Sequence, residues 1–222
     1  MTRRGYDGCV AKSAEVTRIL ERYLVEVVER HELCPWARGA RERGELAIGV
    51  LWGAPAVDAW VAEAARLLAA PAARVAMVVA PELAIERAAL GGIRDAVAAR
   101  IPSAGVAEFH PDAALDLATA ARLVPFLRRS PDPLLQLVPL ALIDAVRAAA
   151  PAAALAHQAA MLGGHAAPPR PALAAQIAAA NHATVTAAHA AITRTLDDIA
   201  ADRRCAYARV GINPGSDRPR SR

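Results

Sequence analysis

The stretch of sequence that decides the fold is RVAMVVA at residues 74–80. Six of these seven residues are apolar and three are valine, which is typical of a strand covered on both faces of a sheet. Pro81 follows directly and ends the strand, because proline cannot donate a hydrogen bond to a neighbouring strand. We therefore predict a buried central strand at this point in the chain.

Two further strands and the helices between them flank this central strand. Residues 46–52 alternate between apolar and other side chains, and residues 104–110 form another short run that ends before a proline. Residues 57–68 and 85–100 have apolar side chains at helical spacing. Strands that alternate with helices across short loops pair in parallel through right-handed crossovers. The predicted fold class is α/β, with a small, mostly parallel three-stranded sheet and flanking helices.

No further strand is expected outside this unit. An amphipathic helix is predicted over residues 13–31, and two more helices over 114–127 and 133–149. Asp132 is expected to cap the last of these, and Pro139 to kink it or split it in two. The helices at 114–149 are expected to close the α/β domain.

The second half of the chain is rich in alanine and is predicted to be all helical. We divide the chain into an α/β domain over residues 1–150, an Ala-rich helical extension over 151–202 and a disordered Arg-rich tail over 203–222. Glycine and proline gather at 163–171, which we interpret as a linker before a last helix at about 172–202.

Charge and composition exclude several classes of protein. The chain of 222 residues has a formal net charge of +4, but its last 20 residues alone hold six arginines and one aspartate, which leaves the rest near neutral. A nucleic-acid interface needs basic side chains gathered on a folded face, so we expect no nucleic-acid partner. With 55% apolar and 22% charged residues, wholesale disorder is excluded.

The location of the protein follows from what the chain lacks. No uninterrupted apolar run reaches the ~18 residues of a membrane-spanning helix, and the start of the chain has no apolar secretory signal. The three cysteines are an odd number and lie far apart, as expected for reduced thiols. We predict a soluble, cytoplasmic protein without a membrane partner, and leave cofactors and the oligomeric state open.

Three short phrases carry a resemblance to a known family. They are LCPWA at 33–37, FHPD at 109–112 and RSPDPL at 129–134, the last leading into IDAV at 143–146. In this order and spacing the chain resembles the bacterial domain-of-unknown-function family 1415 over about residues 14–150. The family has no established activity to carry over. The resemblance implies one recurring constellation of Cys34, His110, Arg129 and Ser130, although Asp132 stands where the family has an aromatic residue.

The residues themselves also make His110 a candidate acid or base. His110 ends the third predicted strand, and ligands of open parallel sheets bind beyond the carboxyl ends of the strands. The two-residue period of a strand places Glu108 on the same face, where its carboxylate can fix the imidazole tautomer. The alternative is structural: His110 donates to a backbone carbonyl and closes the turn at Pro111.

Cys34 is the second candidate catalytic residue. It lies at the end of a predicted helix, where the partial negative charge disfavours a thiolate, whereas the arginines that follow at 38, 41 and 43 favour one. The alternative is a small buried hydrophobe before a proline turn. His31 adds only one further ligand type nearby, so no metal site is expected.

Arg129 and Ser130 are the predicted anion contact. They precede a predicted helix start, where free backbone N–H groups attract anions, and a guanidinium can grip a carboxylate or phosphate with two hydrogen bonds. The alternative is that Asp132 already satisfies those N–H groups as a structural cap. In the last helix, Asn181 falls within an apolar stripe, so its amide should find a partner in the core or in the site.

Three classes of function remain open at this point, one of them a structural protein that docks on a partner through the Ala-rich helix. The first hypothesis is an enzyme that acts on a small anionic substrate in a crevice at the carboxyl ends of the strands. His110 and Cys34 would then carry the chemistry, while Arg129, Ser130, Glu108 and Asn181 would bind the substrate. The alternative is a non-catalytic binding or accessory module in which the same residues are structural.

Overall fold

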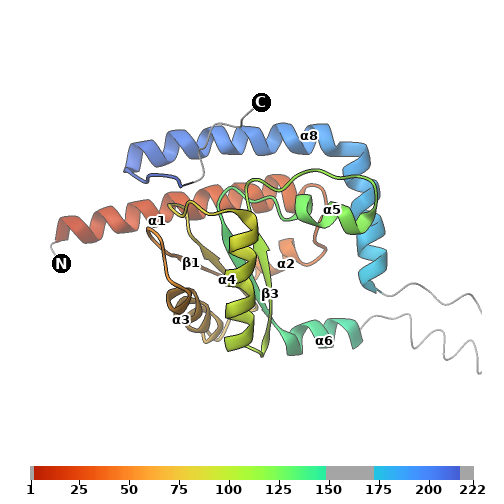
Figure 1. The fold of residues 1–222 in the computed structure, drawn as a ribbon, viewed down its shortest axis with the longest axis horizontal. Coiled ribbons are helices and arrows are strands. Elements are labelled where there is room, and N and C mark those ends of the chain that lie inside the picture. The colour runs from red at the N-terminus through yellow and green to blue at the C-terminus, as the bar shows by residue number, and fades with distance from the viewer. Residues whose placement is uncertain (1–2, 149–172, 216–222) are drawn as a thin grey trace, which may run out of the picture.

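The computed structural model describes residues 3–148 and 173–215 of the chain (Figure 1). The expected linker at 163–171 lies outside these residues. The described part is built around a four-stranded sheet that consists of β1 (Leu46–Val50), β2 (Val75–Val79), β3 (Ala104–Phe109) and β4 (Leu134–Pro139).

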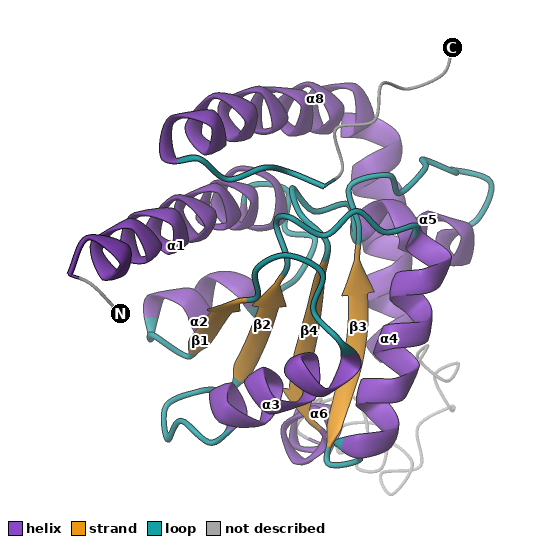
Figure 2. Cartoon of the chain, turned by 60° about the vertical axis from the view of Figure 1, so that its left-hand side comes forward, coloured by secondary structure: helices purple, strands orange, loops and turns teal. Residues whose placement is uncertain are grey.

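The sheet is mixed, in the order β1-β2-β4-β3. β1 pairs in parallel with β2, whereas β4 is antiparallel to both β2 and β3. β1, β2 and β3 therefore all point the same way, and their carboxyl ends meet at the edge where β4 begins. Figure 2 shows this edge as the end to which the arrows of β2 and β3 point.

The prediction of a mostly parallel three-stranded sheet is wrong, because it misses β4. The helix expected over 133–149 is instead β4 followed by α6 (Leu140–Ala148), which begins directly after Pro139. A short apolar run such as 134–138 fits a buried strand as well as a buried helix, and periodicity alone does not separate the two. The expected helix at 114–127 is also shorter, since α5 covers only Ala120–Leu127.

Apolar side chains cover both faces of the sheet, as predicted for residues 74–80. Successive residues of β2 point to opposite sides: Ala76 and Val78 belong to one buried cluster, and Met77 and Val79 to the other. On the first side lie α3 (Val57–Leu68) and α4 (Arg87–Arg100). The other side is covered by α1 (Arg3–Tyr23), α5 and α8 (Leu173–Val210).

The first helical segment is longer than predicted and changes its winding. After α1 the chain continues as the π-helix η1 (Leu24–Glu29), in which Arg30 N–H donates to the Val25 carbonyl. The buried Glu29 carboxylate accepts two hydrogen bonds from Arg41, of 2.6 and 2.9 Å, on α2 (Ala37–Glu42). This ion pair ties η1 to α2 ahead of β1.

α8 lies beside α1 and extends beyond the predicted helix end (Figure 1). Residues 203–210, expected in a disordered tail, form the last turns of α8, and Tyr207 among them is fully buried. The tail boundary at 203 is therefore corrected to a helix that runs to Val210. Among the described helices, none has the length and apolar character that crossing a membrane requires.

Candidate functional site

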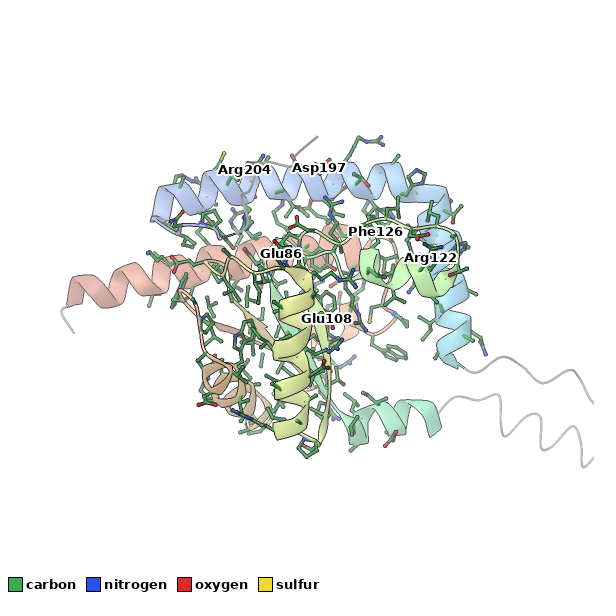
Figure 3. The ribbon with its side chains drawn as sticks, in the orientation of Figure 1. Glu86, Glu108, Arg122, Phe126, Asp197 and Arg204 are labelled. Carbon is green, nitrogen blue, oxygen red and sulfur yellow. The ribbon has the colours of Figure 1, made fainter. Side chains whose placement is uncertain are left out.

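A small pocket opens at the carboxyl end of β3, and we call it the β3 pocket. Its volume is about 30 Å³. It lies between the start of α4, the end of β3 and the helix α5, and is lined by Arg87, Glu108, His110, Ala113, Val124, Pro125 and Arg128. Figure 3 shows Glu86 at the start of α4 and Glu108 on β3. The pocket lies at the carboxyl end of one strand, β3.

Two arginines form the cationic walls of the β3 pocket. Arg87 is the first residue of α4 and is exposed, and its guanidinium makes no hydrogen bond or ion pair with any described residue. Arg128 follows α5 directly, and its closest carboxylate contact is 3.5 Å, to Glu108. Both guanidinium groups therefore keep N–H donors for a ligand.

The amino end of α4 adds to this positive potential. Glu86 occupies the N-cap position, and its side chain makes no capping hydrogen bond. The first N–H groups of a helix have no partner within the helix, and they carry the positive end of its dipole. Arg87 stands on this first turn, so the side-chain charge and the helix terminus favour the same kind of ligand, an anion.

Glu108 is the only carboxylate that lines the pocket within the described residues. Its Oε2 accepts a 2.8 Å hydrogen bond from Arg94 and lies 3.5 Å from Arg128. Burial on its own would raise the pKa of this carboxyl. Hydrogen bonds from its own backbone and from Arg94, with the charges of Arg94 and Arg128, hold the pKa below its ordinary value. Glu108 is thus ionised and partly neutralised.

His110 shares the pocket with Glu108, as the strand period predicted. Both of its ring nitrogens contact the backbone: Nε2 lies 2.9 Å from the Ile85 carbonyl, and Nδ1 accepts from the Asp112 N–H at 3.1 Å. This pair of contacts fits the neutral ring with its hydrogen on Nε2. The contacts are those of the structural alternative, in which the imidazole holds the loop before α4 and closes the turn at Pro111.

Arg129 and Ser130 lie beside the β3 pocket and do not line it. Arg129 donates from Nε to the Pro111 carbonyl at 3.2 Å, and its side chain is 15% exposed. Ser130 is buried and donates to the Asp132 carbonyl at 2.6 Å. The sequence suggested Arg129 as the anion contact, but the residue that lines the pocket is its neighbour Arg128.

Cys34 and Asn181 form a separate neighbourhood at the end of η1. Asn181 is buried on α8 and donates from Nδ2 to the Leu33 carbonyl at 3.0 Å, which is the partner that its position required. Cys34 is half-buried and packs against the buried cluster that contains Met77 and Val79, which we call the main core cluster. Neither residue lines the β3 pocket, so the structure does not bring Cys34 together with His110 and Glu108 in one cavity.

Sequence reasoning missed a charged cluster inside the protein, which we call the Asp132 cluster. Arg203 donates to Asp132 Oδ1 from Nε at 2.7 Å, and Tyr207 donates to Oδ2 at 2.6 Å. The guanidinium also lies 4.9 Å from the centre of the Tyr207 ring. Burial, followed by the charge of Asp132, raises the pKa of Tyr207 well above its usual range, so the hydroxyl stays protonated and donates.

The Asp132 cluster corrects the role predicted for Asp132. Its carboxylate does not cap a helix, because a strand follows it and α8 supplies its partners. An i, i+4 pair of Arg203 and Tyr207 in an apolar helix was the available signal. The tail predicted over 203–222 places both residues outside the last predicted helix.

Neither a metal site within the described residues nor a match to a known protein adds to this description. In the described ranges, no three His, Cys, Asp or Glu side chains gather closely enough to hold a metal ion. No protein-family model matches the chain, and comparisons with curated proteins and with solved structures find no match. The resemblance to family 1415 stays a prediction, and function has to be argued from the site.

Proposed function

We propose that this protein binds a small anionic molecule in the β3 pocket, through a carboxylate or phosphate group of that molecule. The observation that carries the proposal is the pair of guanidinium groups, Arg87 and Arg128, on two walls of one pocket at the amino end of α4. Arginine binds both kinds of anion with paired hydrogen bonds.

The charge and the size of the pocket support an anionic group of limited size. The lining residues carry two positive charges and one negative charge. Arg94, which does not line the pocket, donates a hydrogen bond to Glu108 and offsets its charge. A volume of about 30 Å³ exceeds the ~10–15 Å³ that one water molecule needs, and it is too small for a whole metabolite. The pocket would therefore hold one charged group, with the rest of the ligand outside.

The contacts of the candidate catalytic residues favour binding over catalysis. His110 uses both ring nitrogens on the backbone, and Glu108 is held ionised by arginine. A general base needs a free nitrogen or carboxylate near the proton that it removes. We accordingly propose the non-catalytic binding module, in which His110, Arg129 and Ser130 hold the loops around the pocket. We place this activity in the bacterial cytoplasm, as the family resemblance and the reduced cysteines suggest.

One observation keeps an enzyme as the second candidate. Glu108 and His110 line the same pocket as the two arginines, so an acid–base pair would lie next to the bound anion. In that reading Glu108 has to give up its contact with Arg128 when the substrate binds. Replacement of Glu108 by glutamine separates the candidates: it removes negative charge and strengthens anion binding in a binding module, whereas it abolishes turnover in an enzyme.

The proposal is tested by titration of the protein with inorganic phosphate and with acetate, measured by calorimetry at low ionic strength. We expect Arg87→Gln and Arg128→Gln each to weaken binding of at least one of the two probes by about tenfold, the change that corresponds to one lost charge-assisted hydrogen bond. Arg66→Gln is the matched control, because Arg66 is exposed on α3 and pairs with Glu63 away from the pocket. Equal dissociation constants for all four proteins, or no binding of either probe by the unaltered protein, would overturn the proposal.

A further inference from the structure

The chain continues past α8 as a short segment, residues 211–215, that we call the C-terminal strap. Gly211 ends the helix with a φ of 71°, and the Ile212 N–H donates back to the Tyr207 carbonyl at 2.9 Å. Ile212 is buried in the main core cluster, and Lys12 of α1 donates to the Gly211 carbonyl at 2.8 Å. The strap is therefore anchored at its start by both long helices.

The end of the strap packs against the loop that follows β2. Gly215 N–H faces the Pro81 carbonyl at 3.4 Å. A Cβ atom at position 215 would overlap backbone atoms of Glu82, Leu83 and Ala84. Only glycine fits this contact without a shift of the loop, because the overlapping atoms belong to the backbone and not to the end of a flexible side chain.

The same loop leads to the β3 pocket. The loop at residues 80–86, which we call the β2–α4 loop, ends where α4 begins at Arg87. It is held near that end by His110, whose Nε2 contacts the Ile85 carbonyl, and near its start by Gly215. Between these points the Glu82 carboxylate accepts from the Gly53 N–H at 3.0 Å. The β2–α4 loop is thus held at Pro81 and at Ile85, on both sides of Leu83 and Ala84.

We propose that the C-terminal strap positions Arg87 in the β3 pocket by holding the β2–α4 loop. This inference rests on the proposed anion binding, and it adds a positioning element that lies outside the pocket. The strap reaches the start of the loop and Arg87 follows the loop's end, so a shift of the backbone at Leu83 and Ala84 moves the first turn of α4 relative to Arg128. Paired contacts of two guanidinium groups with one anion depend on that separation.

The test compares two shortened chains. A chain that ends at Gly215 keeps the whole strap, whereas a chain that ends at Asn213 keeps the buried Ile212 but loses the contact with Pro81. We expect the first to bind phosphate or acetate as the full chain does. The second should bind about tenfold more weakly, the loss that corresponds to a misplaced charge-assisted contact. Circular dichroism at the titration temperature verifies that both are folded.

A substitution provides an independent form of the same test. Gly215→Ala in the full chain should also weaken phosphate binding, and Gly92→Ala is the matched control, because a Cβ at position 92 meets no atom within 4 Å. A strap that only stabilises the fold would lower the melting temperature of the Asn213-ended chain and leave the dissociation constant unchanged. That result, with normal binding by the full chain, would overturn this inference and leave the proposed function intact. No binding of either probe by the full chain would overturn the proposed function instead.

Discussion

Two arginine–carboxylate groups lie near the same edge of the sheet and differ in how completely they are paired. In the Asp132 cluster, the side chains of Asp132 and Arg203 are 3% and 4% exposed, and both carboxylate oxygens have donors within 2.7 Å. In the β3 pocket, Arg128 meets its carboxylate only at 3.5 Å, and Arg87 has no partner among the described residues.

The difference shows that pairing and burial, rather than residue type, separate a structural ion pair from a binding site. A buried carboxylate with protein donors on both oxygens is closed to a ligand, and loss of its charged partner is costly because the remaining charge stays buried. A half-exposed guanidinium with a long contact changes partners at little cost. The predictions below test this contrast, beginning with the group that should respond most.

Asp132→Asn should destabilise the protein by about 3–5 kcal/mol, because it removes the charge of one member of a buried ion pair while the other member, Arg203, stays buried. Urea unfolding at neutral pH measures this change. Asp202→Asn is the matched control: Asp202 also contacts two arginines, Arg18 and Arg22, but it lies at the partly exposed interface of α1 and α8. We expect its cost to be about 1 kcal/mol. Equal costs for the two variants would contradict the contrast between buried and exposed pairs.

Tyr207→Phe should cost about 1–2 kcal/mol, because Asp132 Oδ2 loses its donor while the ring keeps its packing. The same unfolding experiment measures it. The double variant with Asp132→Asn should lose less stability than the sum of the losses of the two single variants, since both substitutions act on the same hydrogen bond. Strict additivity would show that the hydroxyl and the carboxylate stabilise the protein independently.

The ionised Glu108 predicts a dependence of stability on acid. Its pKa in the folded protein lies below the ordinary value of 4.5, so its contribution is present above about pH 4.5 and is lost as the pH falls through the folded pKa. Glu108→Gln should therefore cost about 1 kcal/mol at neutral pH, and the gap to the unaltered protein should close in acid. Unfolding measured from pH 7 down to pH 3 for both proteins checks this. A gap that widens in acid would refute the assigned direction of the pKa shift.

Arg87→Gln should have the smallest effect on folding, within about 0.5 kcal/mol, because its exposed guanidinium makes no hydrogen bond or ion pair with the described residues. Thermal unfolding without ligand measures it. Arg203→Gln should instead lower the stability strongly, since it leaves the buried Asp132 carboxylate with Tyr207 as its remaining side-chain donor among the described residues. A large loss of stability in Arg87→Gln would show that this side chain has a structural partner and would weaken its assignment to the ligand.

Local patterns predicted much of the fold. The strands at 46–52, 74–80 and 104–110 agree with β1, β2 and β3 to within two residues, and α3 covers the predicted 57–68. These elements have a clear period or a run of β-branched residues. β4 was missed because Asp132 and Pro133 imitate a helix start, and because its pairing with β2 and β3 depends on residues that lie far away in the sequence.

The candidate site was predicted less completely. The end of β3 was identified from Glu108 and His110, and both line the pocket. Arg87 was overlooked, because an exposed arginine at a helix start has no local signature. Arg128 was passed over in favour of Arg129, since two adjacent arginines look alike until the fold shows which side chain faces the Pro111 carbonyl and which faces Glu108.

The sequence by itself determined β1, β2, β3 and α3, and it required a buried partner for Asn181, because hydrophobic period and desolvation act on each residue locally. It did not determine which arginine is paired and which is open. Arg203 reaches Asp132 across 71 positions of the chain, and Gly215 contacts Pro81 across a still longer stretch of the chain. Only the tertiary structure decides such contacts, because they depend on how α8 and its strap pack over the carboxyl edge of the sheet.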